Sequence, residues 1–179
     1  EYYMRLDDDS IFTKKLPFDP FLRMQQEQLL YAYRRKAHDH WGIKQLNHIL
    51  RRHVEMKPST PFLVGGGFGR QRKIAVTYAG AQPYNNFHVS RVDFWSSPKW
   101  QAFWKDVNDH HGFFKYRMGD ANIHAVAIMM MKPDEWVEWG RSFPYAHNVN
   151  DMGTDWAPDS WRLECESTLQ EVGLVMYQG

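Results

Sequence analysis

Three consecutive acidic residues, Asp7-Asp8-Asp9, are the first group in the chain whose types and spacing suit chemistry. They follow an apolar, β-prone segment at residues 2–6, so the expected geometry is a strand that ends in an acidic turn. Carboxylates on such a turn suit Mg²⁺ or Mn²⁺, which keep ligand positions for phosphate oxygens. Enzymes that use nucleotide-sugars need this arrangement, because the metal neutralises charge on the leaving diphosphate. The alternative interpretation is a solvated loop or a helix cap.

A second group lies in the segment Gly119-Asp120-Ala121-Asn122-Ile123-His124. Asp120 and His124 are four residues apart, so on a helix they share one face. An imidazole next to a carboxylate turn would complete a Mn²⁺ site. The alternative is that Asp120 caps the helix, where the dipole favours a negative charge, and that His124 is satisfied within the core.

A third group is the segment Pro83-Tyr84-Asn85-Asn86-Phe87-His88. Its phenol, two amides and imidazole can all hydrogen-bond to sugar hydroxyl groups. The alternative is an Asn-rich turn that enters a strand.

Two further motifs carry less information. His110 and His111, with Asp109, could suggest a metal site, but they stand at the expected end of a helix, so the favoured interpretation is surface residues. The glycine-rich stretch at residues 65–69 lacks the ending of a phosphate-binding loop, so we interpret it as a flexible loop or a lid.

The composition indicates one globular domain. The 179 residues are 43% hydrophobic, and 22 basic residues balance 21 acidic ones, which gives no reason to expect nucleic acid or an acidic membrane as a partner. Cys165 is the one cysteine, so no disulfide forms within the chain, and this alone favours a reducing compartment. The eight Trp and eleven Phe suit either a thick core or the stacking of aromatic rings on sugars.

These groups require alternating strands and helices to position them. Residues 29–33 fit either a buried strand or a helix end, and residues 58–72 are predicted to be a loop because of their Pro and Gly content. The other expected elements are strands at 2–6, 87–95 and 135–139, helices at 20–28, 43–54, 97–108 and 119–131, and a weak element at 160–177. This alternation predicts a mixed α/β domain without internal repeats.

The order of several motifs resembles glycosyltransferase family 15, the fungal Golgi α-1,2-mannosyltransferases. Residues 2–7 are similar to the family's Y-Y-W-R-V-E segment, and residues 18–24 to its Y-D-x-F-R-x-M segment. Residues 92–95 and 112–114 match L-N-F-F…G-F-F with the same spacing. The sharpest match is residues 112–124 against G-F-F-Y-E-R-W-G-D-A-P-V-H.

The resemblance implies a GT-A-like nucleotide-diphospho-sugar transferase fold in which residues 1–179 are the carboxyl-terminal part of the catalytic domain, without the first nucleotide-binding strands. It implies a retaining, metal-dependent hexosyltransferase that uses GDP-mannose and Mn²⁺ or Mg²⁺, with a glycan or glycoprotein as acceptor. It also implies the Golgi lumen, with the full-length protein as a type II membrane protein.

The resemblance also assigns roles to residues. It places a metal ligand at His124 and the family's strand-end acid at Asp7. This chain has a full Asp-x-Asp there, so Asp9 is also expected at the metal, either together with Asp7 or as the direct ligand while Asp7 faces the ribose or a metal-bound water. The implied catalytic residues are His88 and Asp120. The implied donor contacts, besides Asp7, are Tyr84, Asn85 and Arg117.

One departure concerns the mechanism. The family has a Glu beside the anomeric carbon, and here His88 stands in its place or the Glu is deleted. A double displacement needs a carboxylate nucleophile, so we expect a front-face substitution in which His88 polarises or positions the sugar. The alternatives are an inactive glycan-binding or scaffold module and an unrelated metal-dependent hydrolase.

Overall fold

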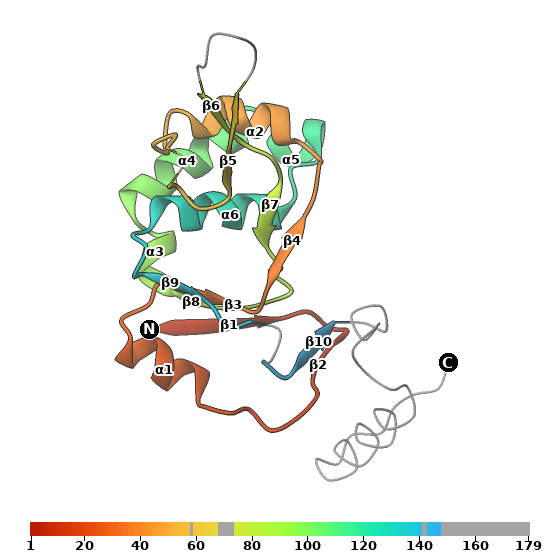
Figure 1. Ribbon diagram of the computed structural model, residues 1–179, viewed down its shortest axis with the longest axis vertical. Helices are drawn as coiled ribbons and strands as arrows, with labels where there is room; N and C mark the ends of the chain where they lie inside the picture. Colours follow the sequence, from red (N-terminus) through yellow and green to blue (C-terminus); the bar gives the residue numbers. More distant parts are fainter. Residues whose placement is uncertain (58, 68–73, 141–142, 148–179) are drawn as a thin grey trace, which may run out of the picture.

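The computed structural model describes residues 1–57, 59–67, 74–140 and 143–147 (Figure 1). The helices are α1 (Pro20–Gln26), α2 (Ile43–Leu50), α3 (Val92–Trp95), α4 (Pro98–Asp109), α5 (Gly112–Tyr116) and α6 (Asp120–Met130). The strands are β1 (Tyr2–Leu6), β2 (Ser10–Phe12), β3 (Tyr31–Tyr33), β4 (Lys36–His38), β5 (Leu63–Gly67), β6 (Ile74–Tyr78), β7 (Ala81–Pro83), β8 (Phe87–Arg91), β9 (Trp136–Glu138) and β10 (Tyr145–His147).

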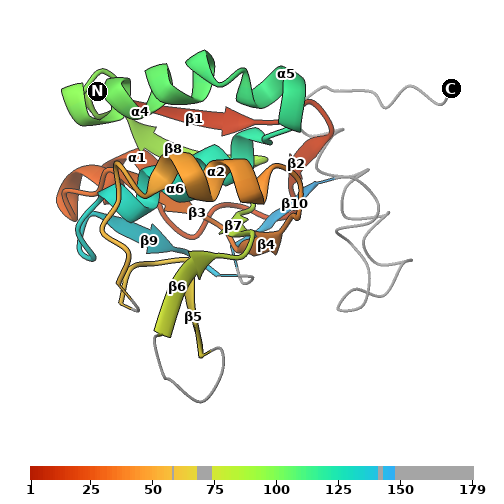
Figure 2. The same ribbon diagram turned by 90° about the horizontal axis from the view of Figure 1, so that it is seen from above.

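A mixed sheet in the order β1-β8-β3-β9 forms the centre of the described chain. Strand β8 is antiparallel to both β1 and β3, and β9 runs parallel to β3. Helices α2, α4 and α6 lie on one side of this sheet, while α1 and the β2–β10 pair lie on the other (Figures 1 and 2). The architecture is therefore layered α/β, as the alternation of elements predicted.

The alternation of side chains along β3 explains why there are two cores. Tyr31 and Tyr33 point toward the helices α2, α4 and α6 and join the larger hydrophobic cluster. Ala32, between them, faces the opposite side and packs in a second cluster with Phe87 and Phe143. The two cores thus share one sheet, and each face of it is buried.

Helix α6 lies in the interior. Most of its side chains from Asn122 to Met129 are buried, and its apolar residues surround the helix instead of forming one stripe. A helix that is apolar all round has to be covered on every side, which explains why α6 packs between the sheet and the outer helices. Its first turn, which carries Asp120 and His124, is where it meets the sheet.

Three two-stranded sheets complete the fold: β10-β2, β4-β7 and β5-β6. In the first, His147 pairs with Ser10 and Tyr145 with Phe12, in antiparallel register. This pairing brings a segment from the far end of the described chain beside the turn that follows β1.

Most of the predicted elements are present. The segment at residues 29–33 contains a strand, β3, and Ser97 caps α4 by accepting a hydrogen bond from the Trp100 amide. The predicted strand at 87–95 is correct only for its first part, because the chain turns into α3 at Val92. The predicted loop at 58–72 was wrong for residues 63–67, which form β5, and the predicted element at 160–177 lies outside the described residues.

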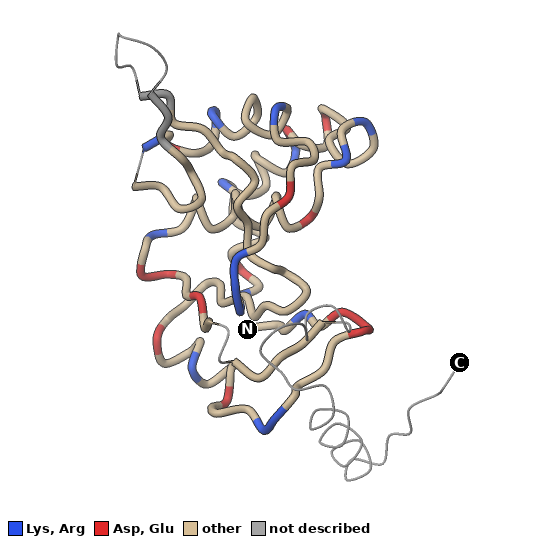
Figure 3. The backbone as a smooth tube through the Cα atoms, turned by 45° about the vertical axis from the view of Figure 1, so that its right-hand side comes forward, with Lys and Arg blue, Asp and Glu red and all other residues tan. Residues whose placement is uncertain are grey.

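The described helices include none that is long and apolar enough to cross a membrane. Basic and acidic residues are interspersed along the described backbone (Figure 3), which agrees with the near-zero net charge.

Candidate functional site

The acidic turn after β1 is held against the turn that precedes β8. The Asp7 amide donates a hydrogen bond to the Asn86 carbonyl at 3.1 Å, and the Asn86 side-chain amide donates to Asp7 Oδ2 at 2.5 Å. The turn closes with a hydrogen bond from the Ser10 amide to the Asp7 carbonyl. Asp7 is half-buried as a result, while Asp9 is exposed. The carboxylate of Asp7 therefore has one fixed orientation at the edge of the sheet.

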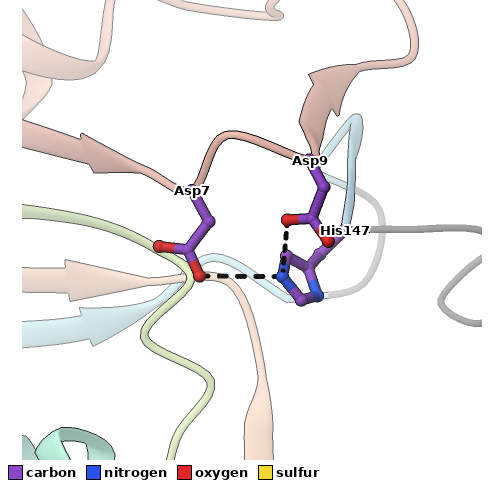
Figure 4. Close-up of side chains that lie close together, drawn as sticks. All are labelled: Asp7, Asp9 and His147. Atoms are coloured by element: carbon purple, nitrogen blue, oxygen red, sulfur yellow. Dashed lines mark ion pairs between the residues drawn. The ribbon is translucent and has the colours of Figure 1, made fainter.

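His147 completes a potential metal site with Asp7 and Asp9 (Figure 4). Its Nε2 lies 2.9 Å from Asp9 Oδ1 and 3.6 Å from Asp7 Oδ2, and one ligand atom from each residue lies within 4.8 Å of the other two. Two carboxylates favour Mg²⁺ or Mn²⁺, and the imidazole favours a transition ion such as Mn²⁺ over Mg²⁺. Among the described residues, this is the one such group of three or more ligands.

Strand pairing and a tyrosine orient the imidazole of His147. The β10–β2 ladder sets its position, and the Tyr84 hydroxyl lies 2.9 Å from His147 Nδ1. With this partner on Nδ1, Nε2 faces the two carboxylates and the Asn86 side-chain amide, whose Nδ2 lies 2.9 Å away. A partner on the other ring nitrogen is the usual way in which proteins orient a metal-binding histidine. The Tyr84 ring is itself covered by Arg35, whose guanidinium lies 4.0 Å from the ring centroid.

Arg5 connects the acidic turn to the first turn of α6. Its Nε donates to Asp7 Oδ1 at 3.0 Å, and its Nη1 donates to Asp120 Oδ2 at 2.6 Å. Burial raises the pKa of Asp120, but the hydrogen bond and charge of Arg5 outweigh this effect, so the pKa of Asp120 lies below its usual value. Asp120 is therefore an ionised hydrogen-bond acceptor at neutral pH.

His88 is buried on β8, opposite Arg5, with a side chain that is 1% exposed. Its Nδ1 lies 3.1 Å from the Asn85 carbonyl, which can only accept, so Nδ1 carries the proton. Its Nε2, 3.2 Å from the Tyr3 hydroxyl, is then the acceptor. Burial lowers the pKa of His88 to about 4, which keeps the ring neutral. His88 was predicted to polarise or position the sugar, and the structure shows that both of its ring nitrogens have partners within the protein.

His124 lies apart from the metal-ligand group that the acidic turn forms. Its Nδ1 is 2.8 Å from the Tyr31 hydroxyl, and its ring lies 4.8 Å from that of His88 and 5.0 Å from that of Trp95. Burial and then the neighbouring His88 lower the pKa of His124 to about 3. The structure thus groups Asp7 and Asp9 with a different histidine from the one that the sequence singled out.

The other predicted site residues are spread around this region. Asn85 is buried, and its side-chain amide is among the groups that lower the pKa of Asp120. Arg117 is exposed and lies over the Trp41 ring at 4.9 Å, in a left-handed backbone conformation at the end of α5. Tyr84 contacts His147, which places it beside the acidic turn.

A family model described as glycolipid 2-alpha-mannosyltransferase matches residues 1–167, nearly the whole chain. The chain belongs to this family. The resemblance to the fungal α-1,2-mannosyltransferases that the motifs indicated is thereby confirmed.

Two relatives in the glycolipid 2-α-mannosyltransferase family show what share of a relative's length this chain covers. The O-glycoside alpha-1,2-mannosyltransferase omh1 of Schizosaccharomyces pombe is 25% identical over 169 residues, which are 93% of this chain and 42% of the relative. The glycolipid 2-alpha-mannosyltransferase of Saccharomyces cerevisiae is 20% identical, over 84% of this chain and 34% of the relative. The chain thus spans less than half the length of these curated relatives.

Solved structures in the glycolipid 2-α-mannosyltransferase family have the same fold. The mannosyltransferase Ktr4p from S. cerevisiae superimposes with a TM-score of 0.66 at 20% identity, covering 97% of this chain and 52% of that one. Core-mannan synthase A from Aspergillus fumigatus, in its Mn/GDP form, gives 0.62 at 18% identity, with 97% and 53% covered. The GT-A-like fold that was predicted is therefore confirmed.

Two residues of the site were missed by sequence reasoning. His147 lies between the predicted strand at 135–139 and the predicted element at 160–177, and no spacing links it to Asp7, because only the β10–β2 pairing brings it there. Arg5 lies within the matched segment at residues 2–7, but its two carboxylate partners are 2 and 115 residues away in the sequence, so no local pattern joins them.

Proposed function

We propose that this protein transfers mannose from GDP-mannose to a hydroxyl group of a glycan or glycoprotein, with retention of configuration and with Mn²⁺ or Mg²⁺ bound. The arrangement that carries this proposal is a potential metal site whose carboxylate, Asp7, is joined through Arg5 to Asp120 at the mouth of a pocket. Family membership and the Mn/GDP form of the Aspergillus relative support the same donor and metal. The Golgi lumen, with a membrane anchor in the full-length protein, remains the proposed location.

The donor set at the acidic turn fits a divalent ion. Asp7, Asp9 and His147 would hold it, in place of the predicted trio with His124. When bound, the ion would neutralise negative charge on the leaving diphosphate.

The residues beside the metal site would orient the donor sugar. Asp120, kept ionised by Arg5, would accept hydrogen bonds from sugar hydroxyl groups, and the Tyr3 hydroxyl, held by His88, would contact the same ring. Tyr84, Asn85 and Arg117 remain predicted donor contacts.

The side chains of strand β8 favour a front-face substitution over a double displacement. It carries no carboxylate from Phe87 to Arg91, so no covalent glycosyl intermediate is proposed there. As the bond between the anomeric carbon and the diphosphate oxygen breaks, the acceptor oxygen bonds to that carbon on the same face. Its proton passes to the departing phosphate oxygen.

The test is transfer of radiolabelled mannose from GDP-mannose to an α-mannoside in the presence of Mn²⁺, combined with thermal unfolding in Mn²⁺ and GDP. We expect an acceptor-dependent product and a rise in melting temperature. His147→Ala is expected to weaken Mn²⁺ binding by at least about tenfold, because one of three ligands is lost, and to remove most of both signals.

Two variants serve as controls. His110→Ala changes an exposed histidine at the end of α4 and is expected to leave both signals unchanged. His124→Ala separates the two candidate sites, because it should keep the Mn²⁺-dependent shift. A shift that survives His147→Ala and disappears in His124→Ala would contradict the proposed metal ligands.

A catalytically inactive glycan-binding module is the second candidate, and the buried neutral His88 is the observation that favours it. Any product that depends on both the donor and the acceptor excludes this candidate. Absence of product together with intact Mn²⁺ and GDP binding would support it.

A further inference from the structure

A pocket of about 400 Å³ opens beside Asp120, on the side of α6 that faces α4. Its volume lies within the range of roughly 300–1,000 Å³ that small-molecule sites occupy. The lining residues are Tyr3, Trp95, Trp100, Gln101, Trp104, Phe113, Asp120, Ile123 and His124.

Aromatic rings form one wall of this pocket. Trp100 packs edge-on against Trp95 at 4.7 Å and in parallel with Trp104 at 6.3 Å, while Phe113 lies 5.4 Å from Trp104. Trp95 donates its indole N–H to Ser90, on β8, so its one polar atom is occupied. Trp104 remains 41% exposed, which is unusual for so large an apolar ring. The wall therefore offers flat apolar surface to a ligand.

Polar groups make up the rest of the lining, and each is oriented by a partner of its own. The Tyr3 hydroxyl is held by His88, and the Asp120 carboxylate by Arg5. Pre-oriented groups of this kind recognise a hydroxylated ligand at a low cost in entropy.

The remaining two polar groups are arranged in the same way. His124 Nδ1 is held by the Tyr31 hydroxyl, which leaves its Nε2 as the second polar atom of the ring. Gln101 donates from Nε2 to the Trp95 carbonyl at 2.6 Å, which leaves its Oε1 as an acceptor. The polar lining residues thus offer a ligand both hydrogen-bond donors and hydrogen-bond acceptors.

The charge of the pocket limits the class of ligand. Asp120 lines it and its charge is balanced by Arg5, while none of the described lining residues is a Lys or Arg, so the pocket offers no free cation to a phosphate or a carboxylate. A neutral ligand with one apolar face and several hydroxyl groups fits a lining that is part aromatic and part polar. Hexopyranoses have these properties, because the axial C–H bonds of one face pack against the negative face of an aromatic ring.

We propose that this pocket is a subsite for a neutral hexopyranose, with Trp104 as the ring on which the sugar stacks. The proposal deepens the proposed function and rests on it for the source of the sugar, either the acceptor glycan or the donor. The ring binds with its apolar face toward Trp104 and its hydroxyl groups toward Asp120 and Gln101.

The first experiment measures sugar binding directly, without metal, nucleotide or catalysis. Saturation-transfer NMR with methyl α-mannopyranoside is recorded on the full-length protein and on two variants, Trp104→Ala and Phe114→Ala. Phe114 is the matched control, because it is an 88% exposed aromatic residue on the neighbouring helix and does not line the pocket.

We expect the sugar signal to persist in Phe114→Ala and to weaken about tenfold in Trp104→Ala, as when an anchoring aromatic side chain is truncated. Trp104→Phe, which keeps a ring, should restore part of the sugar signal, and an unchanged circular dichroism spectrum of Trp104→Ala would show that the loss in that variant is not due to unfolding. Equal signals in the Ala variants would overturn the proposal, as would displacement of the sugar by guanosine, which would make the pocket a nucleobase site.

The second experiment identifies the source of the sugar through steady-state transfer kinetics. If Trp104→Ala raises KM for the α-mannoside acceptor alone, the subsite belongs to the acceptor. If it raises KM for GDP-mannose alone, the subsite belongs to the donor. A protein that binds the sugar without transferring it would contradict the proposed function and leave the subsite supported. If the protein transfers mannose and Trp104→Ala changes neither sugar binding nor KM, the proposed function is supported and the subsite is contradicted.

Discussion

At the scale of single residues, Arg5 is the side chain that connects the proposed metal site to the pocket beside Asp120. It bonds to Asp7 on the acidic turn and to Asp120 on α6, and it pairs across the strands with His88. Its own pKa is raised, because the two carboxylates outweigh the effect of burial. A fixed positive charge between the proposed metal ligands and the sugar pocket is well placed to orient a negatively charged diphosphate.

The neutral state of His88 leads to a prediction about acid stability. An unfolded histidine takes up a proton near pH 6.5, whereas folded His88 does so only near pH 4. Between these values the unfolded chain binds more protons, so the free energy of unfolding falls as the pH falls, by up to about 1.4 kcal/mol per pH unit for one group.

His88→Gln removes this group. Between pH 6.5 and pH 4, the slope of the free energy of unfolding against pH should therefore become smaller, by the equivalent of about one bound proton. The measurement is urea unfolding at several pH values without metal, and the slope against pH is the readout, so a general loss of stability does not disturb it. His38→Gln, at an exposed histidine, should leave the slope unchanged. An unchanged slope in His88→Gln would show that His88 titrates alike in both states.

At the scale of elements, the turn between β6 and β7 connects the β5-β6 sheet to the β4-β7 sheet and packs against the start of α2. Gly80 has a φ of +95°, and its carbonyl accepts a hydrogen bond from the Asp39 amide. A Cβ at this position would lie 2.0 Å from the Asp39 carbonyl oxygen and 2.7 Å from Ile43 Cδ1. The backbone there thus needs glycine for both its conformation and its close packing.

Gly80→Ala and Gly140→Ala separate these two requirements. Gly140 has a similar φ of +83°, but nothing lies within 4 Å of its added Cβ. We expect Gly140→Ala to cost about 1 kcal/mol through the left-handed backbone alone, and Gly80→Ala to cost an additional 1–3 kcal/mol or so through the clash. Chemical denaturation of the two variants measures the difference, and equal losses would contradict the close contact at Gly80.

At the scale of the whole molecule, one sheet supports two hydrophobic cores. Phe103 of α4 belongs to the core on the side of the helices, and Phe87 of β8 to the core on the side of β10; both are 0% exposed. The second core also contains Tyr145, two residues before His147, so packing beneath the sheet positions a proposed metal ligand. Stability and the site are linked through this shared sheet.

This linkage predicts one cooperative unit. Phe87→Leu and Phe103→Leu should each lower the free energy of unfolding by about 1–2 kcal/mol and shift the same transition. Far-UV circular dichroism and tryptophan fluorescence are expected to report coincident curves for both variants. Two separate transitions, each sensitive to one variant only, would show that the cores unfold independently.

Local sequence determined the helices and strands whose signals are short-range. Ser97 and Pro98 mark the start of α4, and the apolar run before Asp7 marks β1, because capping and strand propensity act over a few residues. The family and its fold also follow from the sequence, through ordered motifs that extend along most of the chain. β5 was missed because its glycines are typical of loops, while antiparallel pairing with β6 holds them extended.

Tertiary structure alone decided which residues meet. The family resemblance and the helix face shared with Asp120 pointed to His124 as the metal ligand, whereas the structure groups Asp7 and Asp9 with His147. His147 carried no local signal and reaches Asp7 and Asp9 only because β10 pairs with β2. The physical reason is that helix capping and strand propensity depend on sequence neighbours, whereas a site depends on pairings between distant segments, and one sequence pattern is compatible with many such pairings.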